Sequence, residues 1–138
     1  MEISTAEHEV STVDTVHLAV PAHPAELADL RRRVTSHLAE RGASPELVED
    51  TSIIVSELAT NVVEHSDSSV ISVGLSGEDD RWVLTVADAE QVPAVGSLAL
   101  VDVEAIGGRG LYIVQALART VDVSTVEGVV VVRCTLGA

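Results

Sequence analysis

The sequence has almost no aromatic residues. Its 138 residues include no phenylalanine, one tryptophan and one tyrosine. Apolar residues nevertheless make up 46% of the chain, which excludes a disordered protein, because disordered chains are poor in apolar residues. The core must therefore be built from valine, isoleucine, leucine and alanine, and the length suits one domain with a core of its own.

Basic residues and cysteine are also scarce. Eight lysine and arginine residues against 22 aspartate and glutamate residues give a formal net charge of −14. This charge disfavours direct binding to nucleic acid and suits a partner with a basic patch. The single cysteine, Cys134, excludes an internal disulfide and fits a reducing cytoplasm.

Long apolar runs and targeting features are missing as well. No segment approaches the ~18 consecutive apolar residues that a membrane span needs. The N-terminal stretch MEISTAEHEVST lacks the basic and apolar regions of a signal peptide. We therefore expect a cytoplasmic protein without membrane association, with a flexible tail over residues 1–13 and a single domain over residues 14–138.

Periodic apolar patterns predict an α+β fold. Helical spacing with cap signals predicts helices over residues 24–42 and 45–65, where Ser44 is the N-cap of the second helix. Alternation predicts strands over residues 14–20, 68–76, 81–88, 121–126 and 129–136. Short hairpins between strands favour a two-layer α/β sandwich, with a mixed, mostly antiparallel sheet and helices on one face. Residues 89–107 form a long connection, which is usually functional or mobile.

The stretch SELATNVVEHS places Glu57, Asn61 and His65 one helical turn apart, on one face of the second helix. A glutamate is a candidate general base, and an asparagine oxygen is a neutral ligand for Mg²⁺ beside phosphate oxygens. On spacing alone, an exposed polar stripe is the more common interpretation. His65 fits a helix-terminal residue that favours the dipole better than a metal ligand.

Two further features are candidates for a nucleotide site. Glycines surround Arg109 in GGRGLYIVQALA, where the backbone of Gly108 and Gly110 can approach an anion at a helix N-terminus. This is neither a P-loop nor a dinucleotide fingerprint. Asp88 ends the strand WVLTVAD, where a carboxylate can accept the amino group of adenine or simply terminate a strand.

The order of these features resembles the ATP site of the GHKL superfamily, which includes gyrase, heat-shock chaperone, histidine kinase and mismatch-repair ATPases. SELATNVVEH looks like its N box, and GGRGLYIVQALA looks like its second glycine box. The small size and the wording of both boxes most resemble the anti-sigma-factor serine kinases. The resemblance covers the chain from about Thr15 to Leu136.

The resemblance implies a role for each site residue. Asn61 would hold Mg²⁺, Glu57 would be the catalytic base, and both would face the nucleotide while Leu58 and Val62 hold the helix to the sheet. Asp88 would read the adenine of ATP. The start of the third helix would cradle the phosphates through Gly108, Arg109, Gly110 and Leu111, and the long connection would be the ATP lid.

The resemblance also implies partners. Such family members form homodimers, sequester a sigma factor and phosphorylate a serine on a STAS-domain anti-anti-sigma factor. One box departs from the family pattern, because Glu90 and Val92 replace the two glycines that usually follow Asp88. We therefore expect an anti-sigma factor with weakened or lost nucleotide binding and kinase activity. An active serine protein kinase and a scaffold without sigma binding are the alternatives.

Overall fold

The computed structural model describes residues 14–78, 81–90, 99–100 and 109–137. The expected flexible tail and most of the long connection lie outside these residues. The elements in chain order are β1 (Asp14–Pro21), a 3₁₀ turn η1 (Pro24–Glu26), α2 (Leu27–Glu40), α3 (Pro45–His65), β2 (Val70–Glu78), β3 (Arg81–Ala87), β4 (Ala99–Leu100), α5 (Arg109–Leu117), β5 (Thr120–Val126) and β6 (Val129–Leu136).

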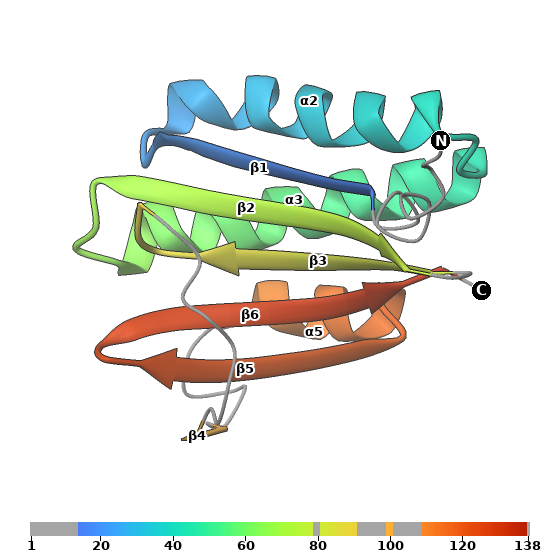
Figure 1. The fold of residues 1–138 in the computed structure, drawn as a ribbon. Helices are drawn as coiled ribbons and strands as arrows, with labels where there is room; N and C mark the ends of the chain where they lie inside the picture. The colour runs from blue at the N-terminus through green and yellow to red at the C-terminus, as the bar shows by residue number, and fades with distance from the viewer. Residues whose placement is uncertain (1–13, 79–80, 91–98, 101–108, 138) are drawn as a thin grey trace, which may run out of the picture.

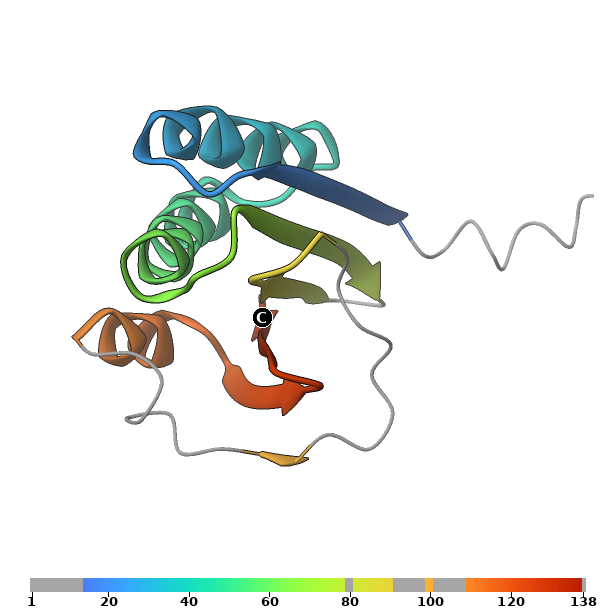
Figure 2. The ribbon, with the colours of Figure 1, turned by 90° about the vertical axis from the view of Figure 1, so that its left-hand side faces the viewer.

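The strands form one sheet in the order β1-β2-β3-β6-β5-β4. Every strand pair of the described residues is antiparallel. Figure 2 shows α2, α3 and α5 together on one side of this sheet. The predicted two-layer α+β architecture is therefore confirmed.

The core lies between the helices and the sheet. One row of it crosses five strands, because paired residues of an antiparallel sheet point to the same face. The row consists of Leu18, Val73, Val86, Val132 and Val123, all buried. The helices meet the sheet with buried aliphatic residues that include Leu30, Val34 and Leu38 of α2 and Ile54, Val55 and Leu58 of α3. Burying each such side chain contributes roughly 1.5–3 kcal/mol, so aliphatic residues suffice for a core without phenylalanine.

Local signals in the sequence explain where elements begin and end. Ser44 caps α3, since its hydroxyl accepts the N–H of Leu47 at 3.1 Å, and Pro45 is the first helical residue, as predicted. The β5–β6 turn uses Glu127 and Gly128, with φ of 52° and 84°. Positive φ at both turn residues is the type I′ geometry that matches the twist of a hairpin.

The structure differs from the sequence-based prediction in several places, among them strand β2, which was predicted over residues 68–76 and runs over Val70–Glu78. The predicted helix over residues 24–42 begins as a 3₁₀ turn, and its α-helical part starts at Leu27. Strand β4 was not predicted, because two residues are too short to show alternation; it pairs with β5 through Ala99 and Leu100. Among the helices described, none is long and apolar enough to cross a membrane.

Candidate functional site

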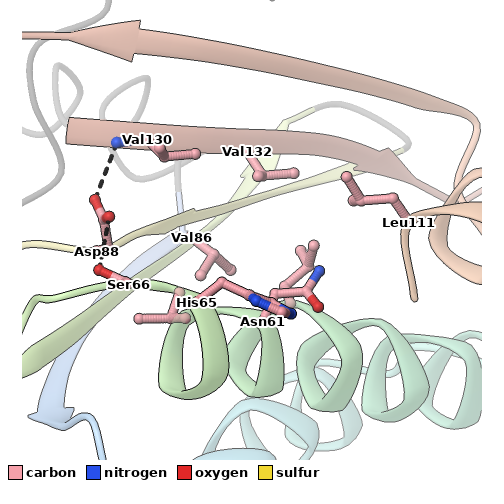
Figure 3. A pocket seen from close by; sticks show the side chains of 10 residues that line it. Asn61, His65, Ser66, Val86, Asp88, Leu111, Val130 and Val132 are labelled. Atoms are coloured by element: carbon pink, nitrogen blue, oxygen red, sulfur yellow. Dashed lines mark hydrogen bonds between the residues drawn. The ribbon is translucent and has the colours of Figure 1, made fainter. Parts of the chain in front are cut away.

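A pocket of about 250 Å³ lies between the second half of α3, the end of β3, the start of β6 and the start of α5 (Figure 3). Its wall is mostly aliphatic, and its polar groups gather at one end of α3 and at the end of β3. The lining residues are Leu58, Asn61, Val62, His65, Ser66, Val86, Asp88, Leu111, Val130 and Val132.

Helix α3 contributes Leu58, Asn61, Val62 and His65 to the pocket. These positions are three or four residues apart and so share one helix face. Glu57 is half-buried and is not among the lining residues. The resemblance implied that both Glu57 and Asn61 face the site. Because four residues of a 3.6-residue helix overshoot one turn by about 40°, Asn61 lies at the edge of the wall and Glu57 lies beyond it.

The carboxylate of Asp88 is held by two hydrogen bonds (Figure 3). Its Oδ1 accepts the backbone N–H of Val130 at 2.9 Å. Its Oδ2 accepts the hydroxyl of Ser66 at 2.9 Å. The strand end, the first residue after α3 and the start of β6 therefore meet at this side chain, and Asp88 lies in the pocket as the resemblance implied.

The opposite wall comes from α5. Leu111 is buried and lines the pocket. The helix begins at Arg109, directly after the glycines that predicted its start, so the backbone of Arg109 and Gly110 forms its first turn. Gly108 lies outside the described residues. The phosphate-binding role of this turn stays a prediction.

The pocket suits the base of an adenine nucleotide. Ligand pockets commonly measure about 300–1,000 Å³, so this one matches a base better than a whole triphosphate. Its aliphatic walls can enclose a flat ring, while Asp88 offers an acceptor for an amino group. Among the described residues, no group of three or more histidine, cysteine, aspartate or glutamate side chains could hold a metal ion. Asn61 with phosphate oxygens is a donor set that suits Mg²⁺.

Glu90, which replaces a glycine of the family pattern, is not a lining residue of this pocket. It is exposed and lines a separate, shallow hollow of about 400 Å³ together with Ala19, Val20, Pro21, Ser69 and Val70. Its side chain therefore does not fill the space beside Asp88. Val92 lies outside the described residues.

Sequence reasoning missed several pocket residues. His65 was expected to be only a helix-terminal residue; it is the last residue of α3, and it also lines the pocket. Ser66 and Val130 were not singled out. The hydrogen bond between Ser66 and Asp88 joins residues 22 apart in sequence. No local pattern reports such a contact.

Comparisons with known proteins point in one direction. A family model described as histidine kinase-like ATPase domain matches residues 20–136. The serine-protein kinase RsbW of Bacillus pumilus is 30% identical over 136 residues, which cover 87% of this chain and 84% of that protein. The serine-protein kinase RsbW of Halalkalibacterium halodurans is 31% identical over 131 residues, covering 85% and 80%.

A solved structure agrees with these matches in its fold. The crystal structure of the RsbU and RsbW domains of a Mycobacterium tuberculosis protein matches with a TM-score of 0.65 at 22% identity. The match covers 90% of this chain but only 32% of that longer chain.

Proposed function

This chain belongs to the histidine kinase-like ATPase domain family, and we propose that it is a cytoplasmic anti-sigma factor controlled by a STAS-domain anti-anti-sigma factor. The observation that carries this proposal is the likeness of nearly the whole chain to RsbW serine-protein kinases. The net charge of −14 adds support, because it favours a partner with a basic surface over direct contact with nucleic acid.

The partner proposal is tested by capture from the native cytoplasm. The tagged chain should recover a sigma factor and a STAS-domain protein, and sigma binding should weaken with added salt, since charges are screened beyond about 8 Å at 0.15 M. Capture of neither partner would favour the scaffold alternative. Light scattering of the purified chain tests the proposed homodimer, because a monomer at every concentration would exclude it.

We further propose that the pocket binds ATP with reduced affinity. Asp88 would receive the adenine, Asn61 would take part in holding Mg²⁺, and the first turn of α5 would lie against the phosphates. Glu90 lines another hollow, so steric filling by its side chain is not the basis for a reduced affinity. The basis is the loss of two glycines, which permit positive φ and close backbone approach.

Calorimetry tests the altered glycine box. ATP with Mg²⁺ is titrated into the parent chain and into a Glu90→Gly/Val92→Gly double variant. We expect tighter binding by the variant. Equal and tight binding by both would show that the segment tolerates Glu90 and Val92, and it would favour an active kinase.

An active serine protein kinase is the second candidate, because the similar proteins are named serine-protein kinases. Glu57 would then act as the general base on the acceptor hydroxyl. Glu57→Gln, which keeps the shape and removes the base, should abolish phosphate transfer to the STAS-domain partner and leave ATP affinity largely unchanged. This variant is informative because Glu57 lies beyond the pocket wall. Phosphate transfer at the parental rate would show that Glu57 is not the general base.

A further inference from the structure

Ser66 occupies a fixed position directly after α3. It is the C-cap residue of the helix, with an extended backbone at φ −107° and ψ 150°, and its N–H donates to the carbonyl of Val62 at 3.0 Å. The residue is half-buried and lines the pocket. The backbone therefore fixes the position of its Cβ, and the hydrogen bonds of the hydroxyl select its rotamer.

The hydrogen bonds of this hydroxyl have a defined direction. Its oxygen accepts the N–H of Ser68 at 2.9 Å. A hydroxyl carries a single hydrogen, and that hydrogen is available for Oδ2 of Asp88, at 2.9 Å. A chain of two bonds thus runs from the backbone of Ser68 through Ser66 to the carboxylate.

Both carboxylate oxygens of Asp88 are anchored, one by Ser66 and the other by the N–H of Val130. Two anchors fix the plane of the carboxylate as well as its position. Each oxygen has about two acceptor directions, so each keeps one for a ligand. An ionised carboxylate offers no donor, which leaves the polar end of the pocket as an acceptor held in one orientation.

From this geometry we infer that Ser66 is a positioning residue for base recognition, which aims Asp88 at the exocyclic amino group of a 6-aminopurine. The inference rests on the proposed binding of an adenine nucleotide. Ser66 acts through Asp88, so its loss reduces the contribution of the amino group and spares the contacts that a purine ring makes with the aliphatic walls.

The test compares two ligands that differ only in the amino group. ADP and the diphosphate of purine riboside, which lacks the 6-amino group, are titrated by NMR up to millimolar concentration. Ser66→Ala should lower the affinity for ADP by about three- to tenfold, as expected for the loss of one hydrogen-bond contribution. The affinity for the ligand without the amino group should not change. Ser66→Thr, which keeps the hydroxyl, should bind ADP with the affinity of the parent chain. Ser69→Ala is the control. Ser69 is a nearby exposed serine whose backbone carbonyl accepts the N–H of Ala22, and its substitution should leave the affinity for both ligands unchanged.

Equal weakening of both ligands, or of neither, would overturn the inference while leaving nucleotide binding in place. A parent that binds neither ligand would also overturn it, but would leave the anti-sigma proposal standing. Amide hydrogen exchange gives a readout without any ligand. In Ser66→Ala the Val130 amide should exchange several-fold faster, because its acceptor on Asp88 has lost the second anchor. Faster exchange at Ser68 alone would assign Ser66 a purely local role and contradict the inference.

Discussion

The two ends of strand β3 are built in opposite ways. At one end, Trp82 packs against the core, and its ring meets the ring of His37 edge to face, with centroids 5.9 Å apart at 83°. At the other end, Val86 and Asp88 border the pocket. The strand thus begins in the packed core, which we call its filled end, and finishes at the pocket, which we call its hollow end.

The difference follows from where the chain places its large residues. Its one tryptophan fills the space under α2, and Gly77 on the paired strand leaves room for the indole ring. Near Asp88 the sheet offers only valines from β3 and β6, and these leave a volume between α3 and α5. A core without phenylalanine is therefore filled at one end and able to receive a flat ligand at the other.

The largest effect is expected from emptying the filled end. Trp82→Ala should lower the free energy of unfolding by about 3 kcal/mol, the lower part of the range for large aromatic residues, because Trp82 is half-buried. Urea unfolding measures the loss. Trp82→Phe, which keeps an aromatic ring against His37, should recover most of it. If Trp82→Ala also abolished ADP binding, the two ends would not be independent.

At the pocket end, Asp88→Asn should act on affinity more than on stability. An asparagine has one oxygen where Asp88 has two, so an amide N–H₂ replaces one of the acceptors held by Ser66 and Val130, and this donor cannot accept the amino group of adenine. We expect ADP affinity to fall by ten- to a hundredfold, or about 1.4–2.8 kcal/mol. Calorimetry measures the affinity, and an unfolding curve within about 1 kcal/mol of the parent serves as the control. Unchanged affinity would remove Asp88 from base recognition.

The strands and the helix start could be predicted from sequence much better than the contacts at either end of β3. The strands carrying Leu18, Val73 and Val86 were predicted because alternation is a local pattern. The start of α3 was predicted from another local signal, the N-cap Ser44 followed by Pro45. The family resemblance brought Asn61 and Asp88 to one site. The contacts of Asp88 with Ser66 and Val130 were not predictable, because they join three elements and depend on how these elements pack.

A matched pair of glycines separates steric from conformational effects at the filled end. A Cβ on Gly77 would lie 3.1 Å from Cη2 and Cζ3 of Trp82, whereas a Cβ on Gly74 would meet only Cδ2 of His17 at 4.0 Å. Gly77→Ala should therefore destabilise the protein by about 1 kcal/mol, since the indole ring must shift. Gly74→Ala should be neutral or stabilising by about 0.5 kcal/mol, because alanine loses less conformational freedom on folding.

Urea midpoints of both variants measure this difference. The Trp82→Ala background provides the control, because the penalty of Gly77→Ala should disappear once the ring is gone. A penalty that persists there would place its cause in the backbone and contradict the close-contact explanation.

The smallest effect is expected from the buried thiol of Cys134. Cys134 lies mid-sheet, paired with Leu84 and Val121, and is fully buried. Burial, with a smaller contribution from the negative charge of Asp122, raises the pKa of its thiol from 9.0 to about 12.

The folded protein then holds this proton more tightly than the unfolded chain. The stability that this provides is fully present below pH 9 and is lost as the pH rises toward 12. At about pH 9.5 the loss relative to neutral pH should be about 1 kcal/mol. Urea unfolding at both pH values measures it, and Cys134→Val, which has no titrating group, should lose less stability over the same interval. An identical pH dependence in both proteins would mean that the thiol ionises as readily in the folded protein as in the unfolded chain, and it would contradict the full burial of Cys134.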